Sequence, residues 1–194
     1  MEIKPVYLMQ PIPYFGEELD YQNFICEPKI DGWRMQVLRY LNGKIEFWGR
    51  RLEKIPNWTY RLNYLIEIAE KFLPPGTILD SELYDERGRR FIPSLFTKKG
   101  GKPIIYVFDI LFYKGEKVYE RKLMERKKIL ESINFLPPFK LIEYKKIISK
   151  DDIFNFLKEA KEKGNEGIIL KHIKSKYIIL EEGPSSTEFW IKIK

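Results

Sequence analysis

Glu27-Pro28-Lys29-Ile30-Asp31-Gly32-Trp33-Arg34 is the stretch of sequence around which the rest of the chain is arranged. It places one lysine beside an Asp-Gly turn, between two apolar runs, 24–26 and 35–41, that have the composition of strands. Glu27 and Asp31 lie two positions before and after Lys29, so on an extended backbone the three side chains share one face. A lysine at the end of a core strand needs compensating charge. The pattern indicates either a functional lysine or a hairpin with a Lys-Asp pair on its surface, and alone it leaves both open.

The composition predicts a basic, globular chain of one domain. Of its 194 residues, 44% are hydrophobic and 15% aromatic, which is enough for a sizeable core. The formal net charge of +7 indicates an anionic partner, and nucleic acid is the first candidate. The single cysteine, Cys26, has no partner for an internal disulfide, which is typical of a reducing cytoplasm. We expect a cytoplasmic protein without a signal peptide, membrane span or zinc site, since His172 is the only histidine.

Hydrophobic periodicity and turn residues predict an α+β fold in which hairpin-linked strands are flanked by helices. The first 22 residues contain three prolines and no clear period, so we expect an irregular arm. The predicted helices run from a cap at Asn57 to residue 73, over 121–133, and from a cap at Ser149 to Gly164. The predicted strands are 24–29, 35–41, 45–48, 78–84, 104–112, 141–144, 167–173 and 189–194.

The lysine stretch resembles the nucleotidyl-transferase motif Glu-x-Lys-x-Asp-Gly-x-Arg of ATP-dependent DNA ligases, RNA ligases and mRNA capping enzymes. In that superfamily the lysine attacks the α-phosphate of a nucleotide and carries the nucleoside monophosphate as a phosphoramidate. The resemblance implies that Lys29 is the nucleophile and that Glu27, Ile30 and Arg34 bind the nucleotide. An amine attacks only when deprotonated, and its ordinary pKa is about 10.4. Desolvation or neighbouring cations must therefore lower the pKa of Lys29 for the reaction to proceed near neutral pH.

Two acidic segments match the ligase pattern in order and at suitable spacing. Asp80-Ser81-Glu82-Leu83 resembles the family's Asp-Gly-Glu-Leu strand, whose glutamate contacts the sugar or assists the metal, with Ser81 in place of the usual glycine. Glu166-Gly167-Ile168-Ile169-Leu170-Lys171 resembles a strand whose acid binds the divalent metal. The resemblance thus implies that Glu82 and Glu166 are metal ligands, that Glu82 and Lys171 bind nucleotide, and that the metal is Mg²⁺, which prefers oxygen donors.

An aromatic and a basic segment complete the resemblance. Phe108 occupies the position of the family phenylalanine that stacks on adenine, although an aromatic residue in an apolar strand is also ordinary core. The terminal Trp190-Ile191-Lys192-Ile193-Lys194 resembles the family's Trp-x-Lys-x-Lys. Because strand side chains alternate, Trp190, Lys192 and Lys194 share one face. The resemblance implies that both lysines hold the α-phosphate and lower the pKa of Lys29.

Several arginines match family positions with less specific roles. Arg50 matches an arginine that touches the ribose or the nucleic-acid phosphate, and paired arginines after a strand are also common on surfaces. We expect nucleic-acid contacts from Arg34, Arg50 and Arg51. Arg121 and Arg126 resemble an arginine-rich helix of the family, and we expect them to shape the surface.

Together these segments imply an ATP-grasp-like nucleotidyltransferase core over residues 1–194, with mostly antiparallel sheets flanked by helices. The implied activity is that of an ATP-dependent DNA ligase that uses ATP and Mg²⁺, carries AMP on Lys29 and seals nicked double-stranded DNA in repair or replication, as a monomer. An RNA ligase of the same fold remains an alternative, as does a nucleic-acid-binding module with a degenerate pocket. A capping enzyme fits less well, because segments 166–171 and 190–194 are ligase-like.

In the ligase family the last lysine motif leads into an oligonucleotide-binding (OB) barrel, whose basic motif orients the leaving pyrophosphate. We expect no OB-fold domain within these 194 residues, which fits either a fragment of a longer ligase or a minimal core. A separate OB-fold or DNA-binding partner is then expected, and sealing of a pre-adenylylated nick should be faster than self-adenylylation. If self-adenylylation is fast, the leaving-group contacts are expected among Lys98, Lys99 and Lys102.

Overall fold

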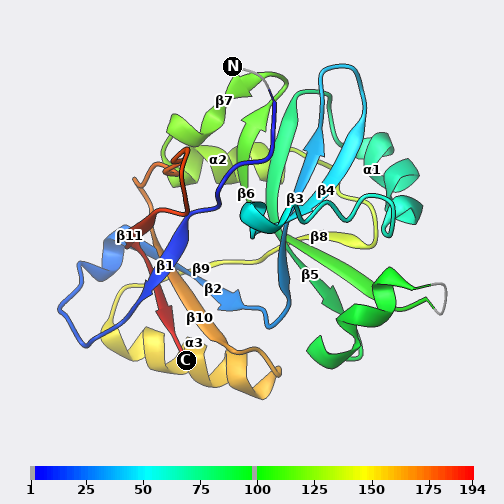
Figure 1. The fold of residues 1–194 in the computed structure, drawn as a ribbon. Helices are drawn as coiled ribbons and strands as arrows, with labels where there is room; N and C mark the ends of the chain where they lie inside the picture. The colour runs from blue at the N-terminus through cyan, green and yellow to red at the C-terminus, as the bar shows by residue number, and fades with distance from the viewer. Residues whose placement is uncertain (1–2, 98–99) are drawn as a thin grey trace.

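The computed structural model describes residues 3–97 and 100–194, whose strands form two sheets (Figure 1). One sheet has the strand order β1-β11-β10-β2-β9. The other has the order β4-β3-β5-β6-β7, with β8 beside β6. Chain neighbours β2 and β3 lie in different sheets, so the short segment 30–32 that joins them crosses from one sheet to the other.

The helices and strands have the following bounds. The strands are β1 (Gln10–Pro13), β2 (Phe24–Lys29), β3 (Trp33–Arg39), β4 (Ile45–Gly49), β5 (Thr77–Asp85), β6 (Pro103–Tyr113), β7 (Glu116–Lys117), β8 (Phe139–Leu141), β9 (Lys145–Lys146), β10 (Gly167–His172) and β11 (Ser186–Ile193). The α-helices are α1 (Ile66–Phe72), α2 (Leu123–Glu131) and α3 (Lys150–Glu162), and short 3₁₀ turns fill several connections.

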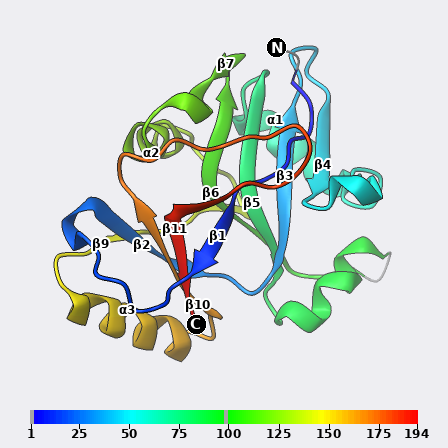
Figure 2. The same ribbon diagram turned by 60° about the vertical axis from the view of Figure 1, so that its left-hand side comes forward.

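The pairing is mostly antiparallel, as the sequence predicts. Two pairs are parallel, β1 with β11 and β6 with β8. α3 covers one face of the sheet that contains β2, β10 and β11, whereas α1 and α2 lie against the other sheet (Figures 1 and 2). The α+β class with antiparallel sheets flanked by helices is confirmed.

Three apolar clusters hold these layers together. The first packs Leu65 and Ala69 from the α1 region and Leu130 of α2 against the sheet of β3, β5 and β6. The second packs Ile153 and Ala160 of α3 against β2, β10 and β11. The third joins the N-terminal segment to both sheets and includes Leu8, Met9, Ile78, Phe112, Tyr177 and Trp190. This third cluster fixes the two sheets relative to each other, and the cavity described below opens between them.

The predicted helix from Asn57 to residue 73 is wrong in its first half. Asn57 forms an isolated bridge with Trp48, and its side chain accepts a hydrogen bond from the Thr59 backbone amide at 3.0 Å. Regular α-helix begins only at Ile66. Trp58 is drawn instead into an aromatic cluster with Trp33 and Phe96, at centroid distances of 6.0 and 5.2 Å. Tertiary packing of one large ring therefore overrides the helical period of this segment.

Two further predictions need correction. Part of the N-terminal arm is ordered as β1, which pairs with β11 at the edge of its sheet, where prolines are tolerated because one side of the strand makes no ladder. Arg126 is fully buried rather than on the surface, and it forms a bidentate ion pair with Asp109 at 2.7 and 2.9 Å. Arg121 is exposed, as expected.

Ser149 caps α3, accepting a hydrogen bond from the Asp152 amide at 3.3 Å, which confirms the predicted start of this helix.

Candidate active site

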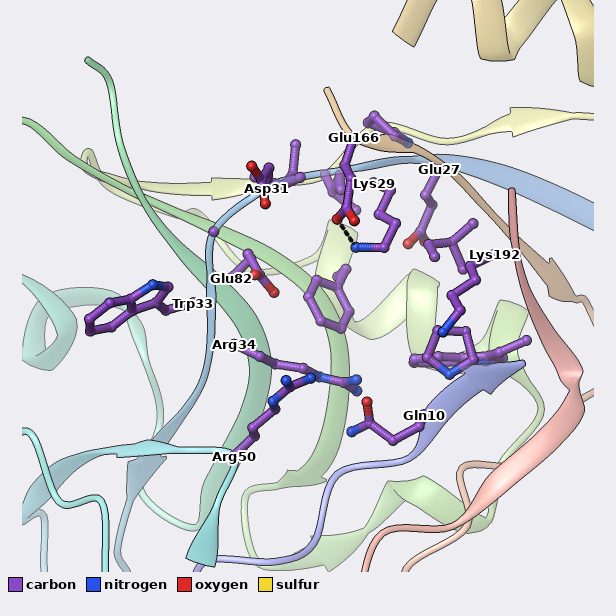
Figure 3. A pocket seen from close by; sticks show the side chains of 18 of the residues that line it. Gln10, Glu27, Lys29, Asp31, Trp33, Arg34, Arg50, Glu82, Glu166 and Lys192 are labelled. Carbon is purple, nitrogen blue, oxygen red and sulfur yellow. Dashed lines mark hydrogen bonds and ion pairs between the residues drawn. The ribbon is translucent and has the colours of Figure 1, made fainter. Parts of the chain in front are cut away.

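A cavity of about 750 Å³ lies between the two sheets. Its size falls within the range of small-molecule sites. Of the described residues that line it, nine are lysine or arginine and four are aspartate or glutamate, so the cavity attracts anions. Lys29, Arg34, Arg50, Glu82 and Lys192 come from different strands or strand ends and point into the same space (Figure 3).

The turn after β2 places Lys29 at the point where the chain crosses between the sheets. A Cβ atom at Gly32 would lie 2.4 Å from the backbone oxygen of Leu83 on β5, so only glycine fits this approach. Asp31 forms an ion pair with Arg89 of the 3₁₀ segment Arg89–Phe96, which ties the turn to that segment. The Asp-Gly pair that follows Lys29 therefore has a structural reason in this fold.

Lys29 and Lys194 share one carboxylate. Glu166 Oε2 pairs with Lys29 Nζ (Figure 3). Glu166 Oε1 pairs with Lys194 Nζ. Burial opposes ionisation of Glu166, but hydrogen bonds from Lys194 and Lys29 outweigh it and hold the pKa of the carboxyl below its ordinary value. A Cβ atom at Gly167 would lie 2.0 Å from the Ile193 backbone oxygen. Glycine after Glu166 thus allows β10 and β11 to approach closely enough to bring these charges together.

A buried group of charges built on Glu27 forms part of the cavity wall. The carboxylate pairs with Lys171 Nζ at 2.7 Å and with Lys127 of α2. Lys127 also donates a hydrogen bond to the backbone oxygen of Phe108 at 2.8 Å. Burial lowers the pKa of Lys171 to about 8, with Glu27 opposing the change and Lys127 adding to it. Lys171 Nζ lies 4.6 Å from the ring centroid of Phe108 and 4.0 Å from that of Trp190, so cation–π contacts also hold it.

Arg34 is held by a second buried network. Its guanidinium donates to both carboxylate oxygens of Asp80, at 3.0 and 2.6 Å. The Tyr177 hydroxyl donates to Asp80 Oδ2 at 2.7 Å and accepts from Arg34 at 3.2 Å and from the Met9 amide at 3.0 Å. The Arg34 guanidinium also lies 5.3 Å from the Phe108 ring centroid. These contacts direct Arg34 into the cavity wall, and this geometry offers no support for the nucleic-acid contact expected of it.

Glu82 differs from the other acids of the cavity because it takes part in no ion pair with the described residues. Burial raises the pKa of its carboxyl to about 7, while Arg34 and Lys29 oppose the change. A half-buried carboxyl with a raised pKa is a suitable ligand for an incoming cation, which favours its ionised form. Glu82 therefore fits the role of a metal ligand, whereas both carboxylate oxygens of Glu166 are paired with lysines.

The rim of the cavity is basic and exposed. Arg50 and Arg51 follow β4, and Lys54 lies in the next turn. All three line the cavity, and none forms an ion pair with another described residue. They are therefore available to an anion that approaches from solvent.

Comparison with known proteins identifies the family. The family model described as "ATP dependent DNA ligase domain" matches residues 8–194. This chain belongs to the ATP-dependent DNA ligase family. It is 31% identical to the DNA ligase of Archaeoglobus fulgidus over 87% of the chain, which corresponds to 31% of that protein. The chain thus spans less than a third of that relative's length.

Solved ligases share the fold at low sequence identity. The ligase domain of LigD from M. tuberculosis aligns with a TM-score of 0.67 and 18% identity, over 95% of this chain and 58% of that one. The ATP-dependent DNA ligase of bacteriophage T7, solved in complex with ATP, aligns with a TM-score of 0.66 and 17% identity, over 97% and 68%. These likenesses confirm the fold of a ligase nucleotidyltransferase domain.

All of the site residues predicted from the ligase motifs line this one cavity. They are Glu27, Lys29, Ile30, Arg34, Arg50, Arg51, Glu82, Phe108, Glu166, Lys171, Lys192 and Lys194. Trp190 and Ile191 enter different apolar clusters, which confirms the predicted alternation of side chains along β11. Ser81, in place of the ligase family's glycine, faces away from the cavity and donates to the Met35 backbone oxygen at 2.7 Å. Its hydroxyl is therefore accommodated without narrowing the site.

Several residues in or around the cavity match no ligase motif. Tyr177 and Lys127 belong to no motif, and only their positions in the fold reveal their contacts with Asp80 and Glu27. Trp58 and Lys54 line the cavity itself, whereas Tyr177 and Lys127 act behind its wall. Lys98 and Lys99 lie outside the described residues, and Lys102 is exposed, with its ammonium 3.5 Å from Glu86. Within residues 3–97 and 100–194, no helix is both long and apolar enough to cross a membrane.

Proposed function

We propose that the chain is the adenylation domain of a DNA ligase in which Lys29 forms a covalent bond to AMP. The Lys29 amine attacks the α-phosphorus of ATP, a phosphorus–nitrogen bond forms, and pyrophosphate leaves. The AMP then passes to the 5′-phosphate at a nick, and the 3′-hydroxyl displaces AMP to join the strand. The observation that carries this proposal is the position of Lys29 at the strand crossing, in a cavity lined by nine cations and floored by Phe108.

The residues around Lys29 suit phosphoryl chemistry, which depends on positioning and charge neutralisation. Lys29 releases a proton to water before it attacks. An arriving phosphate anion competes with Glu166 for the Lys194 ammonium and favours its movement to the phosphate. Lys192 lines the same wall and adds a second ammonium. Phe108 offers its ring to the adenine, while Glu27 and Lys171 stabilise the floor beneath it.

We infer that Mg²⁺ binds beside Glu82. The carboxylates present are hard oxygen donors, and the half-buried Glu82 lacks a cationic partner of its own, so the donor set fits this ion. When bound, the ion neutralises charge on the phosphate oxygens. Glu166 would be a second ligand if the phosphate attracted one of its lysines away. Among residues 3–97 and 100–194 no cluster of three or more His, Cys, Asp or Glu forms a preassembled metal site.

The substrate we propose is nicked double-stranded DNA, bound by a monomer in the cytoplasm. The net charge of +7 and the exposed arginines at the cavity rim support a polyanionic partner. The names of the curated relatives, including the DNA ligases of Archaeoglobus fulgidus and Korarchaeum cryptofilum, favour DNA over RNA. A barrel-type DNA-binding domain, in this protein or in a partner, would complete the enclosure of the duplex.

The test is covalent labelling of the protein by nucleotide. The protein is incubated with Mg²⁺ and ATP or GTP labelled at the α-phosphate, then separated by denaturing electrophoresis. We expect label from ATP on the parent protein and none on Lys29→Ala or Lys29→Arg, because a guanidinium keeps its proton and is no nucleophile. Equal labelling of Lys29→Ala and the parent would contradict the assignment of Lys29, and labelling by GTP alone would indicate a capping enzyme.

A further inference from the structure

The loop that follows β4, residues 50–56, presents an apolar side chain in an unfavourable backbone conformation. Ile55 has φ 46° and ψ 57°, in the left-handed region that branched residues rarely adopt. Pro56 follows directly, and proline disfavours helical conformations of the residue before it. The Ile55 side chain is nevertheless 76% exposed, so burial of this side chain does not offset the backbone strain. Strain of this kind persists where the surrounding structure enforces it, and it is often found at binding sites.

Backbone hydrogen bonds enforce the conformation. The Ile55 amide donates to the Leu52 oxygen and the Lys54 amide donates to the Arg51 oxygen, each at 2.9 Å. The Gly49 amide closes the base of the loop on the Pro56 oxygen, also at 2.9 Å. Ile55 is therefore presented to solvent by a fixed loop.

The 50–56 loop surrounds this isoleucine with positive charge. Arg50, Arg51 and Lys54 are exposed at the rim of the nucleotide cavity, against one acid in the loop, Glu53. The three cations form no ion pair with the described residues. An apolar contact flanked by unpaired cations complements the surface of a nucleic acid, where phosphates flank the sugars and base edges of a groove.

We propose that the 50–56 loop is a duplex-docking edge, in which Ile55 packs against the sugar and base surface beside a nick while Arg51 and Lys54 bind the flanking phosphates. This inference rests on the proposed ligase function, which requires a 5′-phosphate to enter the adjacent cavity. Apolar side chains, isoleucine among them, contact duplex grooves in other DNA-binding proteins. A fixed isoleucine is ready for such a contact without the entropic cost of ordering a mobile loop.

The test replaces Ile55 by asparagine, which tolerates the left-handed conformation and removes the apolar contact. Ile148→Asn is the matched control, because Ile148 is 74% exposed and does not line the cavity between the sheets. Binding of a fluorescent nicked DNA duplex is measured by anisotropy over a range of salt concentrations. Self-adenylylation with labelled ATP is measured in parallel, and thermal unfolding reports the stability of each variant.

We expect Ile55→Asn to bind the nicked duplex about tenfold more weakly than the parent, since loss of one buried aliphatic side chain has an effect of that order. Its salt dependence should match the parent's, whereas Arg51→Ala should reduce the log–log salt slope by about 0.9. Release of backbone strain should raise the melting temperature of Ile55→Asn by about 3 °C. Self-adenylylation should be unchanged, and Ile148→Asn should bind like the parent.

Duplex affinity of Ile55→Asn equal to that of the parent would overturn the inference and leave the exposed isoleucine to a protein partner. Equal losses of duplex affinity in Ile55→Asn and Ile148→Asn would also overturn it, because replacing any exposed isoleucine would then have the same effect. A parent protein that forms the AMP adduct but binds no nicked duplex would refute this docking edge, while the proposed lysyl-AMP chemistry would stand. Failure to form the adduct refutes the proposed function instead.

Discussion

Replacement of Glu82 by glutamine changes stability in a way that follows directly from the cavity. Burial raises the pKa of the Glu82 carboxyl to about 7, from an ordinary value of 4.5. Between these two pH values the folded chain keeps a proton that the unfolded chain has lost, so stability falls as the pH rises. The difference in pKa corresponds to about 3 kcal/mol of unfolding free energy, at about 1.36 kcal/mol per pH unit. Glutamine stays neutral at every pH, so the unfolding free energy of the variant lacks this fall with rising pH.

The assay is urea unfolding of the parent, Glu82→Gln and the control Glu67→Gln, from about pH 5 to about pH 8. Glu67 is an exposed carboxylate on α1, so its replacement should leave the pH dependence parallel to that of the parent. We expect the stability of Glu82→Gln relative to the parent to increase by up to about 3 kcal/mol over this range. Parallel curves for Glu82→Gln and the parent would refute the conclusion that burial keeps this carboxyl protonated.

Further predictions concern the other charged groups. Glu166→Ala should need more Mg²⁺ for adenylylation, and an unchanged Mg²⁺ titration with an unchanged rate would exclude it as a metal ligand. Tyr177→Phe removes the hydroxyl that holds Asp80 and Arg34, so it should raise the KM for ATP several-fold with little change in kcat. The control Tyr119→Phe should change neither the KM for ATP nor kcat. Asp109→Asn leaves Arg126 buried without its counter-charge and should cost about 3 kcal/mol in urea unfolding. Glu116→Gln breaks an exposed pair of the same 2.7 Å length and should cost under about 0.5 kcal/mol; equal losses would contradict the role of burial.

The part of the site that could be predicted from sequence lies on strands. Alternation along the terminal strand places Trp190, Lys192 and Lys194 on one face. The dipeptide Asp31-Gly32 predicts the turn after Lys29. Such features depend on a few neighbouring residues. For this reason the motif positions converge on one cavity although the motifs lie far apart in the chain.

The parts that escaped prediction depend on contacts between distant residues. Tyr177 meets Asp80 across 97 positions, and no local pattern marks a tyrosine in an irregular segment as part of a charge network. Lys127 lies on α2, and the sequence does not distinguish it from the exposed lysine beside it. It is buried because α2 packs against β6. The failed helix start at Asn57 has the same origin, because Trp58 packs on Trp33 and Phe96.

The most direct test of the central claim is to locate the AMP on the chain. The protein is incubated with ATP and Mg²⁺, its intact mass is measured, and the modified peptide is then sequenced by mass spectrometry. We predict a gain of one adenylyl group per chain, on Lys29, that is lost on treatment with acid and returned to ATP by added pyrophosphate. An adenylyl group on Lys171, Lys192 or Lys194, with Lys29 unmodified, would contradict the assignment of Lys29 as the nucleophile.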